Sequence, residues 1–230
     1  MVTAVMLTGD TRRRPLAEIA IECFRAQTHL DSELLIINHS GERFDVADDR
    51  IRELPVARLD TLGDLRNVGL ENARGEYVIS WDDDDWHHPR RIEAQVEACD
   101  DDHDAVVLRS YVVLDLTTSK FFGRSCSSFE CGGCCGTILH RRGVERYRAC
   151  ERHEDNMFVR AFQGRLRVLD NAPALYIRTY SGLNVSPHGH VVETPRRVFR
   201  VSLSQTDIAL AHEVKQIYAR VLPSLAGVVR

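Results

Sequence analysis

The sequence lacks any apolar run close to the length of a membrane-spanning helix, which takes about 20 residues. Its apolar start, residues 2–7, is too short for the hydrophobic region of a signal peptide and predicts a buried strand instead. We therefore expect a cytoplasmic protein without a transmembrane segment.

An overall positive charge is also missing. The net charge is −4, so no global basic field favours nucleic acid, although Arg12–Arg14 and Arg196–Arg197 are candidates for a local basic patch. The composition, with 43% hydrophobic and 28% charged residues, is typical of a soluble globular protein. At 230 residues the chain can bury a substantial core as one domain.

The first half alternates strand and helix patterns, which predicts a mostly parallel sheet covered by helices. We expect strands over 2–8, 34–37, 55–59 and 77–81, and helices over 15–27, 62–75 and 89–99. The less regular second half predicts one long strand over 105–116, a hairpin to 121–122, an irregular segment over 123–137, a helix over 153–163, a strand over 175–180 and a helix over 208–221.

A run of four carboxylates, Asp82–Asp85, directly follows the apolar strand at 77–81. Mutual repulsion raises the pKa of some members of such a cluster unless a cation or basic side chains lie nearby. Magnesium takes oxygen ligands and commonly binds through one or two carboxylates together with substrate phosphates. The run therefore indicates a divalent cation site, and the alternative is a solvated acidic turn that caps the helix starting near Pro89.

The order of several short motifs carries a family resemblance. Leu65-Arg66-Asn67-Val68-Gly69 comes first, then Ala73-Arg74-Gly75-Glu76-Tyr77, then the four aspartates and Pro89. This order resembles the nucleotide-sugar half of family 2 glycosyltransferases, and Gln27-Thr28 and Glu154-Asp155 agree with it. The resemblance implies a GT-A type α/β fold with a mostly parallel, Rossmann-like sheet flanked by helices.

The resemblance also implies the organisation and the reaction. We expect one domain over 1–190, with a nucleotide-sugar half at 1–99 and an acceptor half at 100–190, and a helical extension over 191–230 packed on it. The implied reaction moves a sugar from a nucleoside diphosphate sugar, with a UDP-sugar expected, to an acceptor hydroxyl. It proceeds with inversion in a single displacement.

Several site residues follow from the same resemblance. Asp84 is expected to ligate Mn2+ or Mg2+ directly with Asp82 beside it, and the metal would act as a Lewis acid on the departing diphosphate. Asp83 or Asp82 would alternatively accept hydrogen bonds from ribose or sugar hydroxyls. Arg66 is expected near the nucleotide or the donor sugar, with a surface ion pair as its alternative.

Asp155 is the expected general base, because the acceptor hydroxyl must lose a proton as it attacks the anomeric carbon. Its neighbour Glu154 is the alternative base. Both carboxylates also lie in the first turn of the helix expected over 153–163, where they would offset the helix dipole without any catalytic role.

The sequence departs from the family pattern where the nucleotide base is expected. Asn38 and His39 stand where relatives commonly have acidic residues, and the first strand continues as Leu7-Thr8-Gly9-Asp10 without the usual aromatic residue, although Thr8 matches. Asn38 or His39 can still hydrogen-bond a uracil imide. His188 or His190 is a candidate third metal ligand.

Four of the seven cysteines crowd into ten residues: Cys126, Cys131, Cys134 and Cys135. Cys131 and Cys134 have the spacing of half a zinc knuckle, and Cys150, His153 or His140 could complete a ligand set. We expect instead that these cysteines are small residues on the acceptor side of the site and that no zinc is bound.

Two other functions remain alternatives. A nucleotidyltransferase also uses carboxylates and Mg2+, but the segment Leu7–Arg12 is not glycine-rich enough to cradle a triphosphate well. A catalytically inactive, zinc-stabilised binding module is the second. The acceptor is open among a glycan, a small molecule, a protein side chain and a modified nucleobase.

Overall fold

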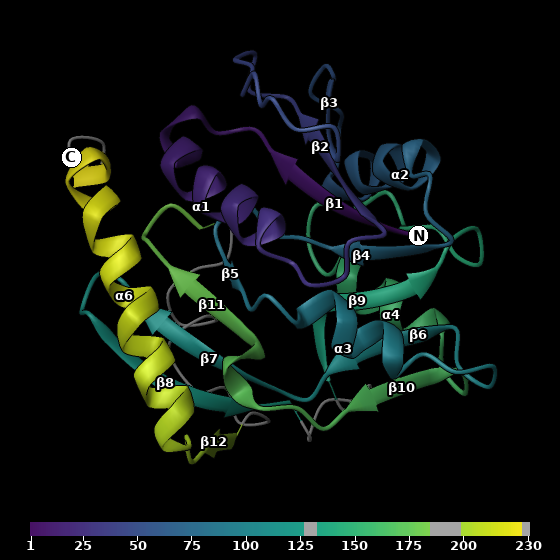
Figure 1. Cartoon of the computed structure of the whole chain (residues 1–230). Coiled ribbons are helices and arrows are strands. Elements are labelled where there is room, and N and C mark those ends of the chain that lie inside the picture. Colours follow the sequence, from purple (N-terminus) through teal and green to yellow (C-terminus); the bar gives the residue numbers. More distant parts are fainter. Residues whose placement is uncertain (127–132, 185–198, 227–230) are drawn as a thin grey trace.

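The structure is a computed structural model that describes residues 1–126, 133–184 and 199–226 (Figure 1). Its larger sheet contains, in spatial order, β10 (Leu166–Leu169), β6 (Ala105–Leu108), β9 (Cys134–Arg141), β4 (Tyr77–Ser80), β1 (Val2–Thr8), β2 (Ser32–Asn38) and β3 (Ile51–Pro55). The strands β3, β2, β1 and β4 run parallel to one another, whereas β9 runs antiparallel to β4 and β6. The predicted α/β class with a Rossmann-like parallel half is confirmed.

Two helices cover opposite faces of the parallel strands. Ala4 and Met6 of β1 belong to the core cluster that contains α1 (Arg14–Arg25), whereas Val5 packs in the cluster with Leu65 of α2 (Leu62–Asn72). This alternation follows from the two-residue period of a strand. Because both faces are covered, these strands read as continuous apolar runs.

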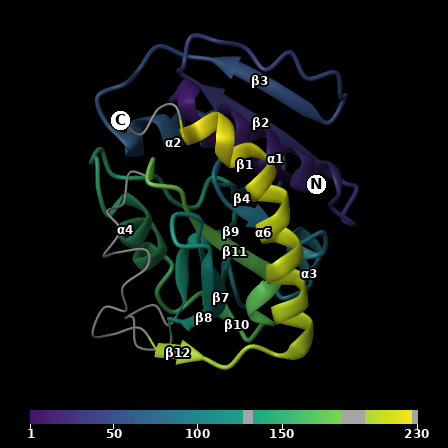
Figure 2. The same cartoon turned by 90° about the vertical axis from the view of Figure 1, so that its left-hand side faces the viewer.

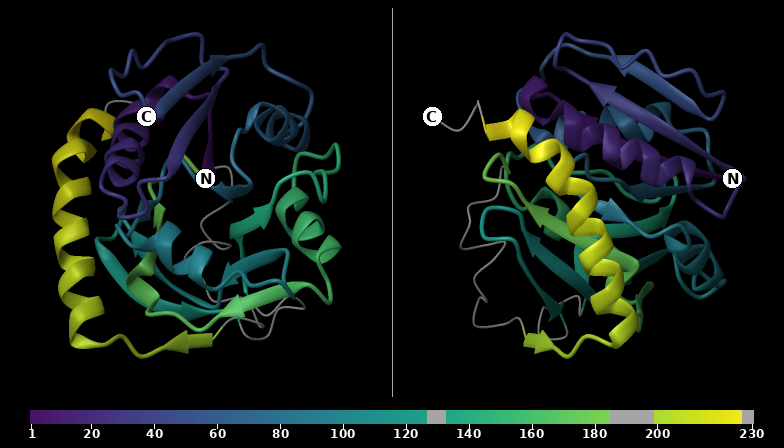
Figure 3. Two further views of the ribbon diagram at one scale, coloured as in Figure 1. Left: turned by 45° about the vertical axis from the view of Figure 1, so that its right-hand side comes forward. Right: turned by 60° about the vertical axis from the view of Figure 1, so that its left-hand side comes forward.

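A second sheet lies beside the first. Its strands, in spatial order, are β12 (Phe199–Val201), β8 (Lys120–Ser125), β7 (Ser110–Asp115), β11 (Tyr176–Tyr180) and β5 (Trp86–His87). The remaining elements are α3 (Arg91–Glu97), α4 (Glu154–Ala161), α6 (Gln205–Ala226) and the short 3-10 helices η1 (Thr11–Arg13) and η2 (Pro173–Leu175). The helix α4 packs against β9, on the side of the larger sheet formed by β9, β6 and β10 (Figure 3).

The C-terminal helix α6 spans from the second sheet to α1 (Figure 2). Its residues Ala211, Val214 and Tyr218 are completely buried and belong to the same core cluster as α1. No helix among the described residues is both long enough and apolar enough to cross a bilayer.

Three expectations about secondary structure are wrong. The segment 105–116 forms two strands in different sheets, β6 and β7, with Arg109 between them. The segment 123–137, expected to be irregular, contains the end of β8 and the start of β9, which lies between β4 and β6. The third strand is formed by residues 51–55 and not by 55–59.

Candidate active site

The carboxyl ends of the parallel strands β1, β2 and β4 meet at one edge of the larger sheet. Thr8 ends β1, Asn38 ends β2, and β4 leads through Trp81 into the aspartate run. The His39 amide donates a hydrogen bond to the Thr8 carbonyl oxygen at 2.9 Å, and the Thr8 hydroxyl hydrogen-bonds the Asp83 carboxylate. Ligands of open α/β sheets bind at such an edge, so the structure brings these predicted residues together.

The aspartate run is largely buried, and only Asp82 is partly exposed. Strand β11 anchors it: the Thr179 amide donates to Asp85 Oδ1 at 2.7 Å, and the Tyr176 hydroxyl donates to Asp85 Oδ2. The Thr179 hydroxyl also donates to the carbonyl oxygen of Asp84. Burial therefore excludes the solvated acidic turn. Asp85, to which the sequence analysis gave no separate role, fixes the loop that presents Asp82 and Asp84.

Burial changes the protonation of these carboxyls. It raises the pKa of Asp83 to about 7, although the positive charge of Arg13 opposes the change. The pKa of Asp84 is also raised, and that of Asp85 is raised well above its usual value, first by burial and then by the neighbouring carboxylates. Burial therefore disfavours the ionised forms of these carboxyls, and a bound cation would stabilise them.

Arg13 is a site residue that the sequence analysis did not identify. From the end of η1 its guanidinium contacts the Asp83 carboxylate, and its Nη2 atom lies 3.0 Å from Asp84 Oδ2. The amide of Asn184 donates to the same Asp84 oxygen at 2.7 Å. One oxygen of the expected metal ligand, Oδ2 of Asp84, thus already has two protein partners.

The arginine run does not form a shared basic patch. Arg12 pairs with Asp10 at 2.6 Å and Arg14 pairs with Glu18 at 3.2 Å, whereas Arg13 points into the site. Arg12–Arg14, one of two candidates for a local basic patch, therefore does not form one. The other candidate patch, at residues 196–197, lies outside the described residues.

Arg66 connects the two halves of the site. Its Nε donates to Glu154 Oε1 at 3.1 Å, its Nη2 lies 4.0 Å from Asp82 Oδ1, and its guanidinium carbon is 5.5 Å from the centre of the Tyr147 ring. The side chain is only 15% exposed. The alternative of a surface ion pair is therefore wrong, and Arg66 lies between Asp82 and Glu154.

The residues around Arg66 explain its motif. Asn67 Nδ2 donates to the Tyr147 carbonyl oxygen, and its Oδ1 accepts from the Tyr147 amide, both at 2.9 Å. A Cβ atom at Gly69 would lie 2.4 Å from a methyl carbon of Val5, so only glycine lets α2 approach β1 this closely. The motif thus holds the segment around Tyr147 against α2, and it allows α2 to pack closely on the sheet.

The two candidate bases have different surroundings at the start of α4. Glu154 is buried and paired with Arg66, and burial, followed by the charge of Asp155, raises its pKa. Asp155 is partly exposed, and one of its oxygens accepts from the Asn156 amide at 2.7 Å. Within the described part of the chain, Asp155 has no basic partner within 4 Å. The Glu154 carboxylate is therefore paired with Arg66, whereas the Asp155 carboxylate can accept a further hydrogen bond.

Asn38 and His39 differ in what they can offer a nucleotide base. Asn38 donates to the Glu42 carbonyl oxygen in the loop after β2 and to the Glu53 carboxylate on β3, and it accepts from the Ser40 amide, at 2.6 to 2.8 Å. The His39 ring lies over Gly9, where a Cβ atom would be 1.7 Å from the ring. Burial, aided by the charge of Arg58, lowers the pKa of His39, so the neutral ring keeps one acceptor nitrogen.

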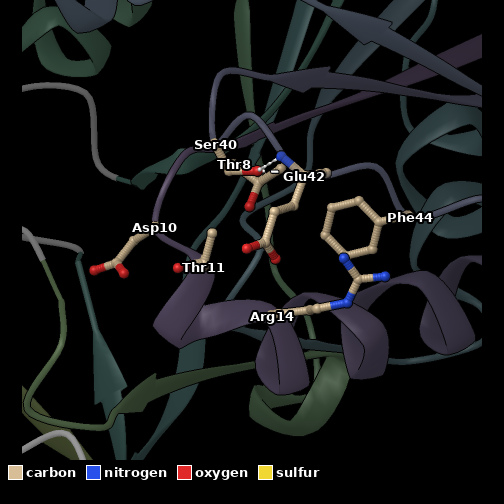
Figure 4. Close-up of a pocket in the computed structure, with 7 residues that line it drawn as sticks. All are labelled: Thr8, Asp10, Thr11, Arg14, Ser40, Glu42 and Phe44. Atoms are coloured by element: carbon tan, nitrogen blue, oxygen red, sulfur yellow. Dashed lines mark hydrogen bonds between the residues drawn. The ribbon is translucent and has the colours of Figure 1, made fainter.

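A small hollow lies beside this edge, between the start of α1 and the loop after β2. Figure 4 shows Ser40, Glu42 and Phe44 on one side and Thr11 and Arg14 on the other. The Arg14 guanidinium carbon lies 4.7 Å from the centre of the Phe44 ring. Phe44 is thus an aromatic residue beside this edge of the sheet, in the loop after β2.

Some predicted ligands cannot be placed. His188, His190 and Cys131 lie outside the described residues. Cys126, Cys134 and Cys135 are buried. Within the ranges that the structure describes, no three His, Cys, Asp or Glu side chains are grouped to hold a metal ion, so a site at the aspartates would rest on two carboxylates.

Known proteins share this sequence pattern. The profile described as Glycosyl transferase family 2 matches residues 12–170. The putative glycosyltransferase EpsH of Bacillus subtilis is 30% identical over 95 residues, which is 38% of this chain and 27% of EpsH. The uncharacterized glycosyltransferase YwdF of the same species is 27% identical over 119 residues, 48% of this chain and 44% of YwdF. The chain thus covers less than half the length of either relative.

Solved structures share the fold. Residues 1–349 of S. aureus TarS in complex with UDP-GlcNAc match with a TM-score of 0.59 and 16% identity, over 96% of this chain and 67% of that one. The complex of the same TarS fragment with UDP matches with a TM-score of 0.55 and 16% identity, over 78% of this chain and 60% of that one. The GT-A prediction is confirmed, and with the family profile covering more than half of its length, the chain belongs to glycosyltransferase family 2.

Proposed function

We propose that the protein transfers a sugar from a nucleoside diphosphate sugar to an acceptor hydroxyl. The observation that carries this proposal is the position of Arg66 between Asp82 and Glu154. Asp82 belongs to the loop after the nucleotide-sugar strand, and Glu154 opens the helix of the acceptor half. A donor held at the aspartates and an acceptor held at α4 would therefore react beside one buried guanidinium.

The carboxylates present fit a divalent metal ion. Asp82 and Asp84 offer hard oxygen donors, and two carboxylates suffice for magnesium when substrate phosphates complete the shell. A bound cation would also stabilise the ionised forms of the buried carboxyls, which burial disfavours. Mn2+ or Mg2+ held there would supply Lewis-acid stabilisation of the departing diphosphate. The protein's part is to hold the two carboxylates rigidly, which it does through the anchoring of Asp85 on β11.

Asp155 is the proposed general base, with Glu154 as the alternative. Its carboxylate would accept the proton of the acceptor hydroxyl during attack on the anomeric carbon. A single displacement of this kind inverts the anomeric configuration. Glu154, through its hydrogen bond to Arg66, would keep the guanidinium oriented towards the donor.

A UDP-sugar is the proposed donor. Two matching TarS structures were solved with UDP and UDP-GlcNAc, and the neutral His39 ring offers an acceptor nitrogen to a uracil imide. Four classes of acceptor are proposed: a glycan, a small molecule, a protein side chain and a modified nucleobase.

A donor screen tests the proposal. Melting temperature is measured with each of a panel of nucleotide sugars in the presence of Mn2+, because a ligand that binds only the native state stabilises it. We expect one UDP-sugar to raise the melting temperature and to be hydrolysed slowly to UDP. Release of pyrophosphate would indicate a nucleotidyltransferase, and failure of every donor to bind would indicate a module without this activity.

A further inference from the structure

Arg13 carries a buried guanidinium that is not fully satisfied. Its side chain is 12% exposed, and its Nη2 atom serves both Asp83 and Asp84. Its Nε atom is buried and has no hydrogen-bond partner among the described residues. Arginine has five N–H donors in a rigid fork, and a buried donor without an acceptor lowers stability. Arg13 therefore has the capacity to bind one more acceptor at this position.

Arg13 and a metal ion would compete for the same carboxylate. Nη2 lies 3.0 Å from Asp84 Oδ2, and the Asn184 amide donates to that oxygen at 2.7 Å. A dication coordinated by Asp84 would lie beside the guanidinium, and like charges at such a distance repel strongly in a buried site. In the absence of substrate, a metal ion can therefore coordinate Asp84 tightly only if Arg13 moves away.

The substrate of the proposed reaction offers Arg13 a replacement partner. A diphosphate presents several charged oxygens, and arginine binds phosphate with two parallel hydrogen bonds. We propose, resting on the proposed function, that Arg13 is a displaceable counter-ion. It neutralises Asp83 and Asp84 in the donor-free protein and moves to the diphosphate when the donor and the metal ion bind.

This exchange couples the two ligands. In the wild-type protein the metal ion alone must displace Arg13 without compensation, so it binds weakly until a diphosphate is present. By linkage, the metal ion and the nucleotide raise each other's affinity by the same factor. Direct contact between the metal ion and the phosphate also raises the two affinities. The contribution of Arg13 to the coupling factor is the part that is lost when Arg13 is substituted.

The first test is a calorimetric titration with Mn2+ alone, on the full chain without nucleotide. The variant is Arg13→Gln, and the matched control is Arg12→Gln, which removes the same charge one residue away from an exposed pair with Asp10. We expect Arg13→Gln to bind Mn2+ about tenfold tighter than wild type, within the usual range of coupling factors. The control should stay within about threefold of wild type, which is well below that coupling factor.

The second test repeats the titration with UDP, with and without Mn2+. Arg13→Gln should weaken UDP binding without metal and reduce the factor by which Mn2+ strengthens it. Arg13→Lys, which keeps the charge but loses the fork, should bind Mn2+ alone as weakly as wild type and serves if Arg13→Gln does not fold. If Mn2+ alone binds no tighter to Arg13→Gln, or binds tighter to Arg13→Lys than to wild type, the counter-ion role is wrong while the proposed function stands. If no form binds UDP with Mn2+, both fail.

Discussion

The hydroxyl of Tyr218 donates a hydrogen bond to the backbone carbonyl oxygen of Asp84 at 3.2 Å, across 134 positions of sequence. Tyr218 is completely buried in α6. Burial, followed by the charges of Cys23 and Asp85, raises its pKa well above the usual value, so the hydroxyl stays protonated and remains a donor. The C-terminal helix thus supports the backbone of the loop that presents the expected metal ligand.

Tyr218→Phe is therefore expected to affect both stability and the site. The Asp84 carbonyl keeps the Thr179 hydroxyl as a donor, so the free energy of unfolding in urea should fall by only about 0.5–1.5 kcal/mol, the usual net value of one hydrogen bond. Affinity for UDP with Mn2+ should also fall. Tyr77→Phe, on β4 and over Arg141, is the control and should leave that affinity unchanged. Equal affinities in the two variants would make the Tyr218 contact purely structural.

Asp84→Ala should abolish sugar transfer and nearly all metal-dependent donor binding, whereas Asp83→Ala should be milder. The reason is their difference in role: Asp83 is held by the Thr8 hydroxyl as well as by Arg13, whereas Asp84 is the expected direct ligand. Donor binding is measured by calorimetry with and without Mn2+, and turnover with and without EDTA. Wild-type turnover in Asp84→Ala, or in native protein treated with EDTA, would contradict the metal assignment.

Much of the site could be predicted because its signals are local. The aspartate run follows a strand directly, and parallel strands bring their carboxyl ends to one edge, so Thr8, Asn38 and Asp82 had to lie near one another once the sheet was recognised. Arg66 and Glu154 came from the order of motifs. Their contact at 3.1 Å across 88 positions confirms that the two halves of the chain face each other.

Other features depend on contacts that no local pattern contains. The alternation over 105–116 is continuous, yet the strand breaks at Arg109 because Asn171 Oδ1 accepts from both the Arg109 and the Ser110 amides, at 3.1 and 3.2 Å. These bonds lie where the chain passes from one sheet to the other, and the Arg109 amide also donates to the Leu169 carbonyl oxygen at 3.0 Å. Likewise, nothing in the run Arg12–Arg14 indicates which arginine points inward.

Acidification should destabilise the protein through His140. Burial lowers the pKa of this histidine to about 4, so the unfolded chain binds a proton below its usual pKa near 6.5 while the folded chain does not. The stabilising effect is therefore complete above pH 6.5 and is lost as the pH falls towards 4, at up to about 1.4 kcal/mol per pH unit. His87, whose pKa is lowered well below its usual value by burial, acts in the same direction.

The variants His140→Gln and His140→Leu isolate that contribution. Both remove the titrating group, and the ring they replace packs against Phe158 and Phe162, so each should lower stability at neutral pH. Between pH 6.5 and 4.5, however, their free energies of unfolding should decline less steeply than that of wild type. The difference in slope should correspond to at most one proton taken up on unfolding. Parallel curves for wild type and both variants would show that His140 does not control the acid response.

The remaining prediction concerns the general base. Glu154 is fixed by Arg66, whereas Asp155 is partly exposed and has no basic partner within 4 Å in the described ranges. Because a base acts on the acceptor proton and not on the diphosphate, Asp155 should be dispensable for donor binding. Glu154→Gln removes a charge from a buried ion pair and should instead disturb Arg66 and donor affinity together.

Asp155→Asn keeps the size of the side chain and removes its basicity. It should lower kcat by about 10²–10⁴-fold, the range typical for loss of a general base, and leave the dissociation constant of the donor within a few-fold of wild type. If Asp155 only offsets the dipole of α4, the same change should cost about 0.3–1 kcal/mol of stability and almost no rate. Turnover and melting temperature measured on one preparation separate the two roles, and near-normal turnover would remove Asp155 from the mechanism and make Glu154 the residue to test next.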